Sequence, residues 1–257
     1  MSSVIKDRVF IVTGGSKGFG LAIARSLIEQ HARVGLVGRD IQALNAAVSE
    51  LGEDSAVGVA ADVAHKKDIT AAFAQIKLHF GRLDGLVNNA GVARPSTVEN
   101  LVEEEVILQT QTNFLGTVFC CQVVIPFLRG AENPRIINIS SASAWHYDEM
   151  SHLSIYASTK AAVERFTRDL RVEVQGDGIG VTCIRPGGAW TNFADDWNPD
   201  ALTAGLEAWA HAGTYMDTGM ETKQVGDAVT YAVSQPAGVA IDLLEIRPNV
   251  PTEKGRY

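Results

Sequence analysis

Residues 8–20 read Arg-Val-Phe-Ile-Val-Thr-Gly-Gly-Ser-Lys-Gly-Phe-Gly, an apolar run that ends in a glycine-rich turn. The β-branched run Arg8–Thr13 is typical of a buried strand, and Gly18–His31 carries apolar residues at helical spacing. Glycine permits a tight turn, and the free N–H groups of a helix start attract phosphate. The stretch therefore predicts a strand–turn–helix unit that holds the pyrophosphate of a dinucleotide, with a purely structural turn as the alternative. The turn residues expected to contact it are Gly14, Ser16, Lys17, Gly18, Phe19 and Gly20.

The same alternation of short β-branched runs and longer helical patterns continues along the chain. Further strands are expected at Arg33–Val37, Ala56–Ala60, Leu83–Val87, Arg135–Ser140, Gly180–Ile184 and Ile241–Ile246. Further helices are expected at Ile41–Leu51, Ile69–Phe80, Glu103–Leu128, Ser154–Val174 and Gln224–Ser234. Such alternation implies parallel strands joined by right-handed crossovers. We therefore expect one α/β domain over residues 1–257, a doubly wound, Rossmann-like parallel sheet of about seven strands with helices on both faces.

Composition narrows the classes of function. The chain has 257 residues, of which 46% are hydrophobic, and its net charge of −8 provides no basic stripe for nucleic acid. No signal peptide and no membrane span are expected from its apolar stretches. Three cysteines fit a reducing compartment, and Cys120 and Cys121 are expected to be buried structural thiols. The histidines, including His146 and His152, show no metal-ligand spacing, so no metal site is expected. The cysteines and the lack of a signal peptide together predict a cytoplasmic protein.

Tyr156 and Lys160 form a pair that can carry proton transfer. Residues i and i+4 share one face of a helix, so the two side chains are expected to point the same way. A free phenol has a pKa near ~10, and a neighbouring ammonium would lower that pKa toward neutrality. Tyr156 could then donate a proton to a carbonyl or accept one from an alcohol. The alternative is an ordinary amphipathic pair on a surface helix.

The end of the second expected strand predicts the cofactor. Enzymes that prefer NAD carry an acidic residue there, which binds the ribose hydroxyls. In this chain Gly38 holds that position and Arg39 follows it, while Lys17 adds a second cation in the glycine turn. Glycine leaves room for a 2′-phosphate, and the guanidinium fork suits its oxygens. The pattern predicts NADP(H), although both cations could also be ordinary surface charges.

Seven ordered motifs resemble those of the short-chain dehydrogenase/reductase family. They are Thr13-Gly14-x-x-x-Gly18-x-Gly20, Asp62-Val63, Asn88-Asn89-Ala90-Gly91, Asn113, Ile139-Ser140-Ser141, Tyr156-x-x-x-Lys160, and Pro186-Gly187 with Thr191. The resemblance implies a catalytic tetrad of Asn113, Ser141, Tyr156 and Lys160, with Asn113 binding a water that leads from Lys160 to solvent. It also implies adenine contacts from Asp62 and Val63, a nicotinamide held by the segment of Pro186-Gly187 with Thr191, and cofactor contacts from Tyr156 and Lys160. Further cofactor contacts are implied for Asn89, Ala90, Gly91, Pro186, Gly187, Ala189 and Thr191.

The identity of the serine is open between two candidates. The family usually places it about a dozen residues before the tyrosine, whereas Ser141 lies 15 and Ser143 lies 13 residues before Tyr156. Its position after Asn138-Ile139 at a strand end favours Ser141, since the loop Ala144–Leu153 can absorb extra length.

The stretch Gly187–Gly219 has weak periodicity and is expected to be a loop with one or two short helices, a lid over the cleft. The aromatic and large apolar residues expected near the reacting centre are Trp145, Tyr147, Trp190, Phe193, Trp197, Trp209 and Met216. The stretch from Gly187 to Met220 contains no Arg or Lys, which disfavours an anionic substrate.

We therefore expect an oxidoreductase, a carbonyl reductase or alcohol dehydrogenase, that acts on a hydrophobic ketone or secondary alcohol. Two alternatives stay open, a dehydratase or epimerase on the same scaffold and a catalytically idle NADP(H)-sensing regulator. The resemblance further implies a homodimer or homotetramer. Neither a nucleic-acid nor a membrane partner is expected.

Overall fold

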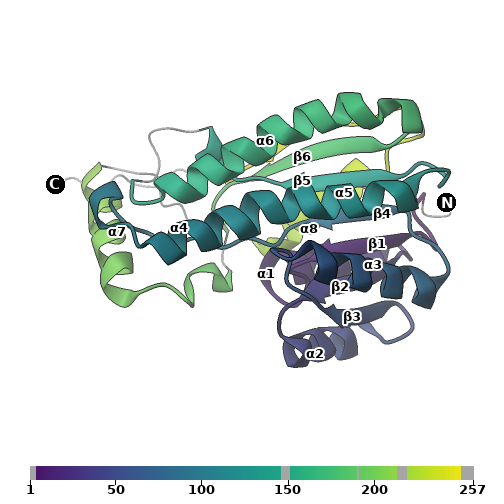
Figure 1. The fold of residues 1–257 in the computed structure, drawn as a ribbon, viewed down its shortest axis with the longest axis horizontal. Coiled ribbons are helices and arrows are strands. Elements are labelled where there is room, and N and C mark those ends of the chain that lie inside the picture. Colours follow the sequence, from purple (N-terminus) through teal and green to yellow (C-terminus); the bar gives the residue numbers. More distant parts are fainter. Residues whose placement is uncertain (1–3, 146–150, 190, 213–218, 250–257) are drawn as a thin grey trace.

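One parallel sheet of seven strands organises the computed structural model, which describes residues 4–145, 151–189, 191–212 and 219–249 (Figure 1). The strands are β1 Val9–Thr13, β2 Arg33–Gly38, β3 Ala56–Ala60, β4 Gly85–Asn88, β5 Arg135–Ile139, β6 Gly180–Pro186 and β7 Leu243–Ile246. Their order is β3-β2-β1-β4-β5-β6-β7, with every pair parallel. The expected doubly wound, seven-stranded α/β fold is confirmed, and the expected strand ends shift by only a few residues.

Strand order reverses direction at β1, because β2 and β3 lie on one side of it and β4 to β7 on the other. Register brings Thr13 of β1 beside Val37 of β2, and Asn88 of β4 beside Asn138 of β5. The carboxyl ends of these strands therefore meet at one edge, and ligands of open α/β sheets bind beside that reversal point.

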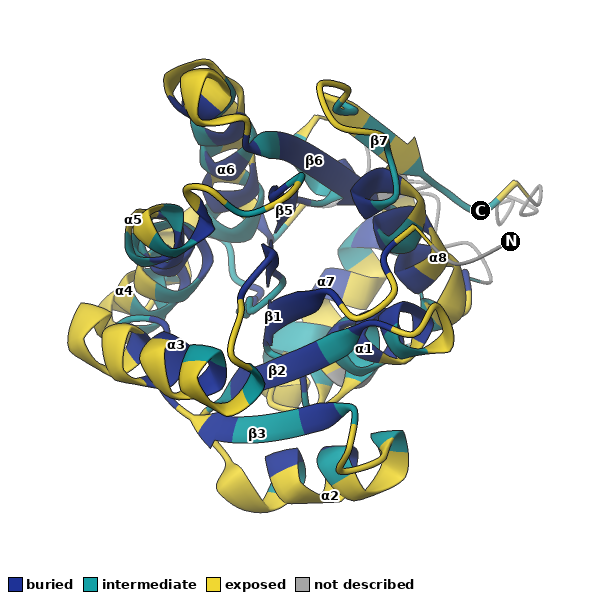
Figure 2. Cartoon of the chain, turned by 90° about the vertical axis from the view of Figure 1, so that its right-hand side faces the viewer, coloured by how far each residue is buried: buried dark blue, intermediate teal, exposed yellow. Residues whose placement is uncertain are grey.

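Helices cover both faces of the sheet (Figure 2). The face that carries α1 Gly18–Glu29, α2 Ile41–Leu51 and α8 Thr222–Val233 has one apolar core, and the face of α3 Lys66–Phe80, α5 Gly116–Leu128 and α6 Ser154–Val174 has another. Strands β1, β2, β4, β5 and β6 are buried between them, the edge strands β3 and β7 are partly exposed, and the helices expose their outer sides. Strands enclosed in this way read as continuous apolar runs, which is why the β-branched runs were informative.

The expected helix Glu103–Leu128 contains an irregularity. It consists of α4 Glu103–Gln109, a π-helical turn Thr110–Leu115, and α5. It meets the length and hydropathy of a membrane span, so the expectation that no stretch would do so was wrong. Its apolar residues Cys120, Cys121, Val124 and Leu128 are buried in the core beneath α3, which accounts for the high hydropathy without a membrane.

The segment after β6 contains more helix than its sequence suggests. It contains a 3-10 turn, Asn192–Ala194, and a helix α7, Pro199–Ala212, whose 14 residues exceed the short helices that we expected. Helix α7 lies at one end of the molecule, away from the sheet (Figure 1). Its Trp209 is buried and packs with Ala93 and Leu153, so tertiary contacts hold a helix whose apolar periodicity is weak.

Candidate active site

The turn between β1 and α1 requires glycine at several of its positions. Gly14 and Gly18 have φ values of 63° and 55°, a region that favours glycine. A Cβ on Gly20 would lie 2.0 Å from the carbonyl oxygen of Gly14, so the backbone here approaches itself without side chains. Lys17 precedes the helix in extended conformation, Ser16 lies in the turn, and Phe19 belongs to the first turn of α1. The turn thus leaves the first N–H groups of α1 open to a phosphate.

Polar contacts from β4 hold this turn in place. The Asn89 amide donates to the carbonyl oxygens of Thr13 and Gly14 at 3.0 and 3.2 Å. The Thr13 hydroxyl in turn accepts from the backbone N–H groups of Asn89 and Ala90 at 3.0 and 3.1 Å. The structure therefore brings the glycine turn and the Asn88-Asn89-Ala90-Gly91 motif together, although about 75 residues separate them in sequence. These hydrogen bonds explain the polar side chains of Thr13 and Asn89.

Basic side chains stand free at the end of β2. The strand ends at Gly38, as expected, and Arg39 and Lys17 are exposed, with no ion pair to any described residue. The next acid, Asp40, accepts from the backbone N–H groups of Gln42 and Ala43 and caps α2. Asp40 therefore serves as the N-cap of α2.

Asp62 and Val63 line the next loop of the same edge. The Asp62 carboxylate accepts from the Ala64 backbone N–H at 2.9 Å, which fixes the loop. Val63 is buried, and a Cβ on Gly116 would lie 2.9 Å from its Cγ2, so α5 passes close behind it. The contact of both residues with an adenine stays a prediction.

Tyr156 contacts Ser141 directly. Burial raises the pKa of Tyr156 to about 12, and the hydrogen bond with Ser141 opposes that rise. The Ser141 hydroxyl also accepts from the Ser143 hydroxyl at 2.9 Å and from its backbone N–H at 3.3 Å. Of the two serine candidates, the structure thus places Ser141 against the phenol and Ser143 behind it.

Lys160 lies one turn further along α6 and is buried. Its Nζ donates to the carbonyl oxygen of Ile139 at 2.8 Å and lies 5.9 Å from the Tyr156 ring centroid. Burial lowers the pKa of Lys160 to about 8. Burial of the phenol outweighs the expected lowering of the Tyr156 pKa by this ammonium, and Nζ donates to the Ile139 carbonyl oxygen.

Asn113 sits in the π-helical turn and is fully buried. Its Oδ1 accepts from the Val92 N–H at 2.8 Å, and its amide donates to the Val92 carbonyl and the Thr159 hydroxyl at 2.9 and 3.0 Å. These contacts use both amide hydrogens, so the side chain is engaged in holding the loop after β4 against α6. A Cβ on Gly91 would lie 3.3 Å from Lys160 Nζ and 3.4 Å from Asn113 Oδ1, so Gly91, Asn113 and Lys160 lie close together.

The segment after β6 reaches the glycine turn. The Gly187 N–H donates to the Ile246 carbonyl at 2.8 Å, and Ala189 forms a bridge with Met220. Thr191 approaches Gly18, since a Cβ there would lie 3.7 Å from the threonine Cβ. Pro186, Gly187, Ala189 and Thr191 therefore run along the same edge as the cluster of Ser141, Tyr156 and Lys160.

Known proteins share this arrangement. A family model described as short chain dehydrogenase matches residues 8–202. The chain belongs to the short-chain dehydrogenase family. An uncharacterized oxidoreductase of Staphylococcus epidermidis is 32% identical over 244 residues, which cover 95% of this chain and 98% of that protein. One of Staphylococcus aureus is 30% identical over 246 residues, which cover 96% and 99%.

Two solved structures of this family resemble the chain over almost its full length. The closed form of serine dehydrogenase complexed with NADP+ has a TM-score of 0.82 and 29% identity, and covers 97% of this chain and 98% of that one. L-sorbose reductase from Gluconobacter frateurii, complexed with NADPH and L-sorbose, has a TM-score of 0.79 and 26% identity, with 95% and 97% covered. The expected NADP(H) cofactor agrees with the ligands named for both.

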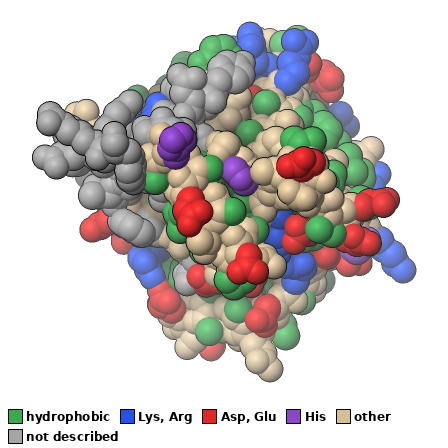
Figure 3. All heavy atoms as spheres, turned by 90° about the vertical axis from the view of Figure 1, so that its left-hand side faces the viewer, with side chains coloured by type: hydrophobic (Ala, Val, Ile, Leu, Met, Phe, Trp, Pro, Cys, Tyr) green, Lys and Arg blue, Asp and Glu red, His purple; other side chains and the backbone are tan. Residues whose placement is uncertain are grey.

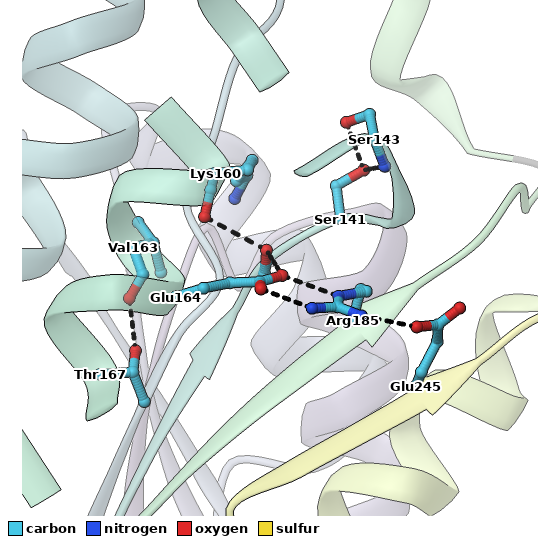
Figure 4. A network of polar contacts seen from close by, with 9 residues as sticks. Ser141, Ser143, Lys160, Val163, Glu164, Thr167, Arg185 and Glu245 are labelled. Carbon is cyan, nitrogen blue, oxygen red and sulfur yellow. Dashed lines mark hydrogen bonds and ion pairs between the residues drawn. The ribbon is translucent and has the colours of Figure 1, made fainter. Parts of the chain in front are cut away.

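Close to Ser141 and Lys160, the chain has a polar network that the sequence did not predict (Figure 4). Arg185 of β6 binds both oxygens of Glu164 on α6 at 2.8 and 2.6 Å, and Glu245 of β7 at 2.7 Å. The Ser140 hydroxyl donates to Glu164 at 2.7 Å and also lies 3.3 Å from the Lys160 carbonyl. The paired carboxylates raise the pKa of Arg185, which is only 7% exposed. The spacing of Glu164 four residues after Lys160 was a usable signal, because it places both on one helix face.

An aromatic wall stands beside Tyr156. The ring of Phe193 lies 5.5 Å from that of Tyr156 and 6.0 Å from that of Trp197. Trp145 is 58% exposed and stacks at 5.5 Å on the Arg185 guanidinium. Trp209 is buried in the cluster with Ala93 and Leu153. Tyr147, Trp190, Met216 and His146 lie outside the described residues.

Thiols and metal ligands add nothing to this site. Cys120, Cys121 and Cys183 are buried and unpaired, and burial raises the pKa of each, which confirms the reading of Cys120 and Cys121 as structural thiols. Within the described ranges, no three residues of the types His, Cys, Asp and Glu gather into a metal site.

Proposed function

We propose that this oxidoreductase uses NADP(H) to interconvert a hydrophobic ketone and the corresponding secondary alcohol, with Tyr156 as general acid and base. The observation that carries the proposal is the hydrogen-bonded contact of Tyr156 with Ser141, beside Lys160, at the carboxyl edge of the sheet. Ligands bind at this edge in open α/β sheets, so the phenol stands where a substrate would.

The residues of the edge fit the cofactor. The turn of Gly14, Gly18 and Gly20 presents N–H groups to a pyrophosphate, and Arg39 and Lys17 are free to pair with a 2′-phosphate. Without a side chain, Gly91 keeps the space beside Lys160 Nζ clear. When bound, the cofactor supplies or takes up a hydride. The NADP ligands of the serine dehydrogenase and the L-sorbose reductase support the same choice.

The chain's own residues would handle the proton and the charge. Ser141 can donate a hydrogen bond to the substrate oxygen, and Tyr156 gives that oxygen its proton in reduction and takes it in oxidation. Charge then develops on the Tyr156 oxygen, and the Lys160 ammonium stabilises it because the site is buried. Asn113 keeps the loop after β4 and the helix of Lys160 in contact.

The surroundings favour an apolar substrate. Phe193 and Trp197 form a wall beside Tyr156, and ligand pockets are mostly apolar with few polar anchors. The face of the molecule that carries α7 shows apolar, acidic, basic and histidine side chains interspersed (Figure 3), and the sequence from Gly187 to Met220 holds no Arg or Lys. A carboxylate or phosphate on the substrate would therefore lack a cation in this segment.

The test is a panel of hydrophobic ketones with NADPH and of their alcohols with NADP+, followed by the absorbance of NADPH. Net loss or gain of NADPH is expected with at least one pair. Conversion of a substrate without net change in NADPH would indicate a dehydratase or epimerase. Tight NADPH binding with no conversion of any compound would indicate a regulator and overturn the proposal.

A further inference from the structure

Two tryptophans of the aromatic wall differ in their hydrogen bonding. Trp209 donates its Nε1–H to the Ser151 carbonyl oxygen at 2.6 Å. Trp197 packs against the same cluster of Ala93, Leu153 and Trp209, but its Nε1 is buried and has no hydrogen-bond partner. An indole N–H can only donate, so one of the two buried donors is satisfied and the other is not.

The unmet donor of Trp197 is unusual within the described part of the chain. Three of the other buried atoms without a partner belong to Arg8, Asn88 and Arg135, whose remaining nitrogens do form hydrogen bonds. The fourth, the Thr230 hydroxyl, lies on α8, which packs against α1. Trp197 alone combines a side chain with a single polar atom, no partner, and a place beside Tyr156. Buried polar groups are almost always hydrogen-bonded, and an exception needs a cause.

We propose that Trp197 is a specificity-determining residue whose indole N–H binds a second, uncharged oxygen of the substrate. The inference rests on the proposed function and deepens it: the substrate would be a mostly apolar ketone or alcohol that carries a further carbonyl or hydroxyl oxygen. A neutral acceptor fits because the sequence from Gly187 to Met220 contains no cation to balance a carboxylate.

Phe193 stands between the two groups that the substrate would touch. Its ring lies 5.5 Å from Tyr156 and 6.0 Å from Trp197, and the residue is 38% exposed in the turn Asn192–Ala194. A partly exposed side chain on a short turn gives up little buried area when it moves. Binding would displace Phe193 and uncover both the phenol and the indole N–H.

The experiment compares ethyl acetoacetate with 2-heptanone, a ketone of similar length that lacks the ester carbonyl. The ratio of their kcat/KM values with NADPH is measured in the wild type, in Trp197→Phe and in the control Trp209→Phe. The ratio should fall at least about tenfold in Trp197→Phe, since a site built to bond an oxygen discriminates strongly against an analogue without it. The ratio should hold in Trp209→Phe. An unchanged ratio in Trp197→Phe would overturn the inference and leave the proposed function standing.

Thermal unfolding provides a second readout that activity does not affect. Both substitutions remove part of a packed indole, but only Trp209→Phe also loses a hydrogen bond, the one to Ser151, so Trp209→Phe should lower Tm more than Trp197→Phe. A Tm for Trp197→Phe as low as that of Trp209→Phe would show that Trp197 is structural. If no ketone is reduced, the proposed function fails, and calorimetry of ethyl acetoacetate with the NADPH-bound protein then decides: equal affinity in wild type and Trp197→Phe overturns the inference as well.

Discussion

Arginines occupy opposite situations at the two halves of the sheet edge. At the β2 end, Arg39 is exposed and has no ion pair with any described residue. At the β6 end, Arg185 is 7% exposed and all of its bonds go to Glu164 and Glu245. An exposed cation stays available to a ligand, while a buried one must be paired by the protein itself. The comparison shows that one residue type stays available to a ligand in one half and fixes the architecture in the other.

The largest effect is expected on turnover, from removal of the Tyr156 hydroxyl in the half of the edge that carries Ser141, Tyr156 and Lys160. Tyr156→Phe keeps the ring that packs against Phe193 but removes the exchangeable proton, so turnover should fall by ~10²–10⁴. NADPH affinity, measured by fluorescence titration, should change little. Activity within threefold of the wild type would show that another group is the acid.

The pairing of the buried Arg185 should show in the free energy of unfolding when its partner Glu164 is removed. Glu164→Ala leaves Arg185 buried with one carboxylate, so the free energy of unfolding should fall by about 3 kcal/mol in urea titration. Asp169→Ala is the matched control, because Asp169 pairs with Arg165 four residues earlier on the same helix but in solvent. That loss should stay below about 1 kcal/mol. Equal losses would contradict the contrast between buried and exposed pairs.

The free arginine should be revealed by cofactor choice. The wild type should favour NADPH over NADH at least tenfold in kcat/KM, a difference of roughly 1.4 kcal/mol. Gly38→Asp/Arg39→Leu should lose or reverse that preference, and a Cβ at Gly38 meets nothing closer than 3.6 Å. Preference for NADH in the wild type would show that Arg39 is only a surface charge.

The smallest effect is expected from pH. Burial lowers the pKa of Lys160 to about 8, so its ammonium is present below that pH and is lost above it. Because the pKa of Tyr156 is about 12, the phenol keeps its proton throughout the range. The kcat/KM of ketone reduction should therefore be level from about pH 6 to 7 and about half-maximal near pH 8. Lys160→Arg should be slower but lack this decline, because a guanidinium stays charged. An identical decline in that variant would assign it to another group.

The sequence by itself determined the fold and most of the site edge. Buried parallel strands demand β-branched runs, and the glycine turn demands Gly14, Gly18 and Gly20, so both leave a local pattern. The pair Tyr156 and Lys160 could be read in the same way, because helical spacing alone places them on one face.

Only the tertiary structure decided which groups satisfy one another. The Glu164–Arg185–Glu245 network joins α6, β6 and β7, and apart from the four-residue spacing between Lys160 and Glu164 no local pattern announces it. The same holds for the hydrogen bond of Lys160 Nζ to Ile139 and for the contact of Ser141 rather than Ser143 with Tyr156. It also holds for the indole N–H groups, of which that of Trp209 has a partner and that of Trp197 has none. Hydrogen bonds between distant segments depend on how those segments pack, and a local pattern carries no record of that packing.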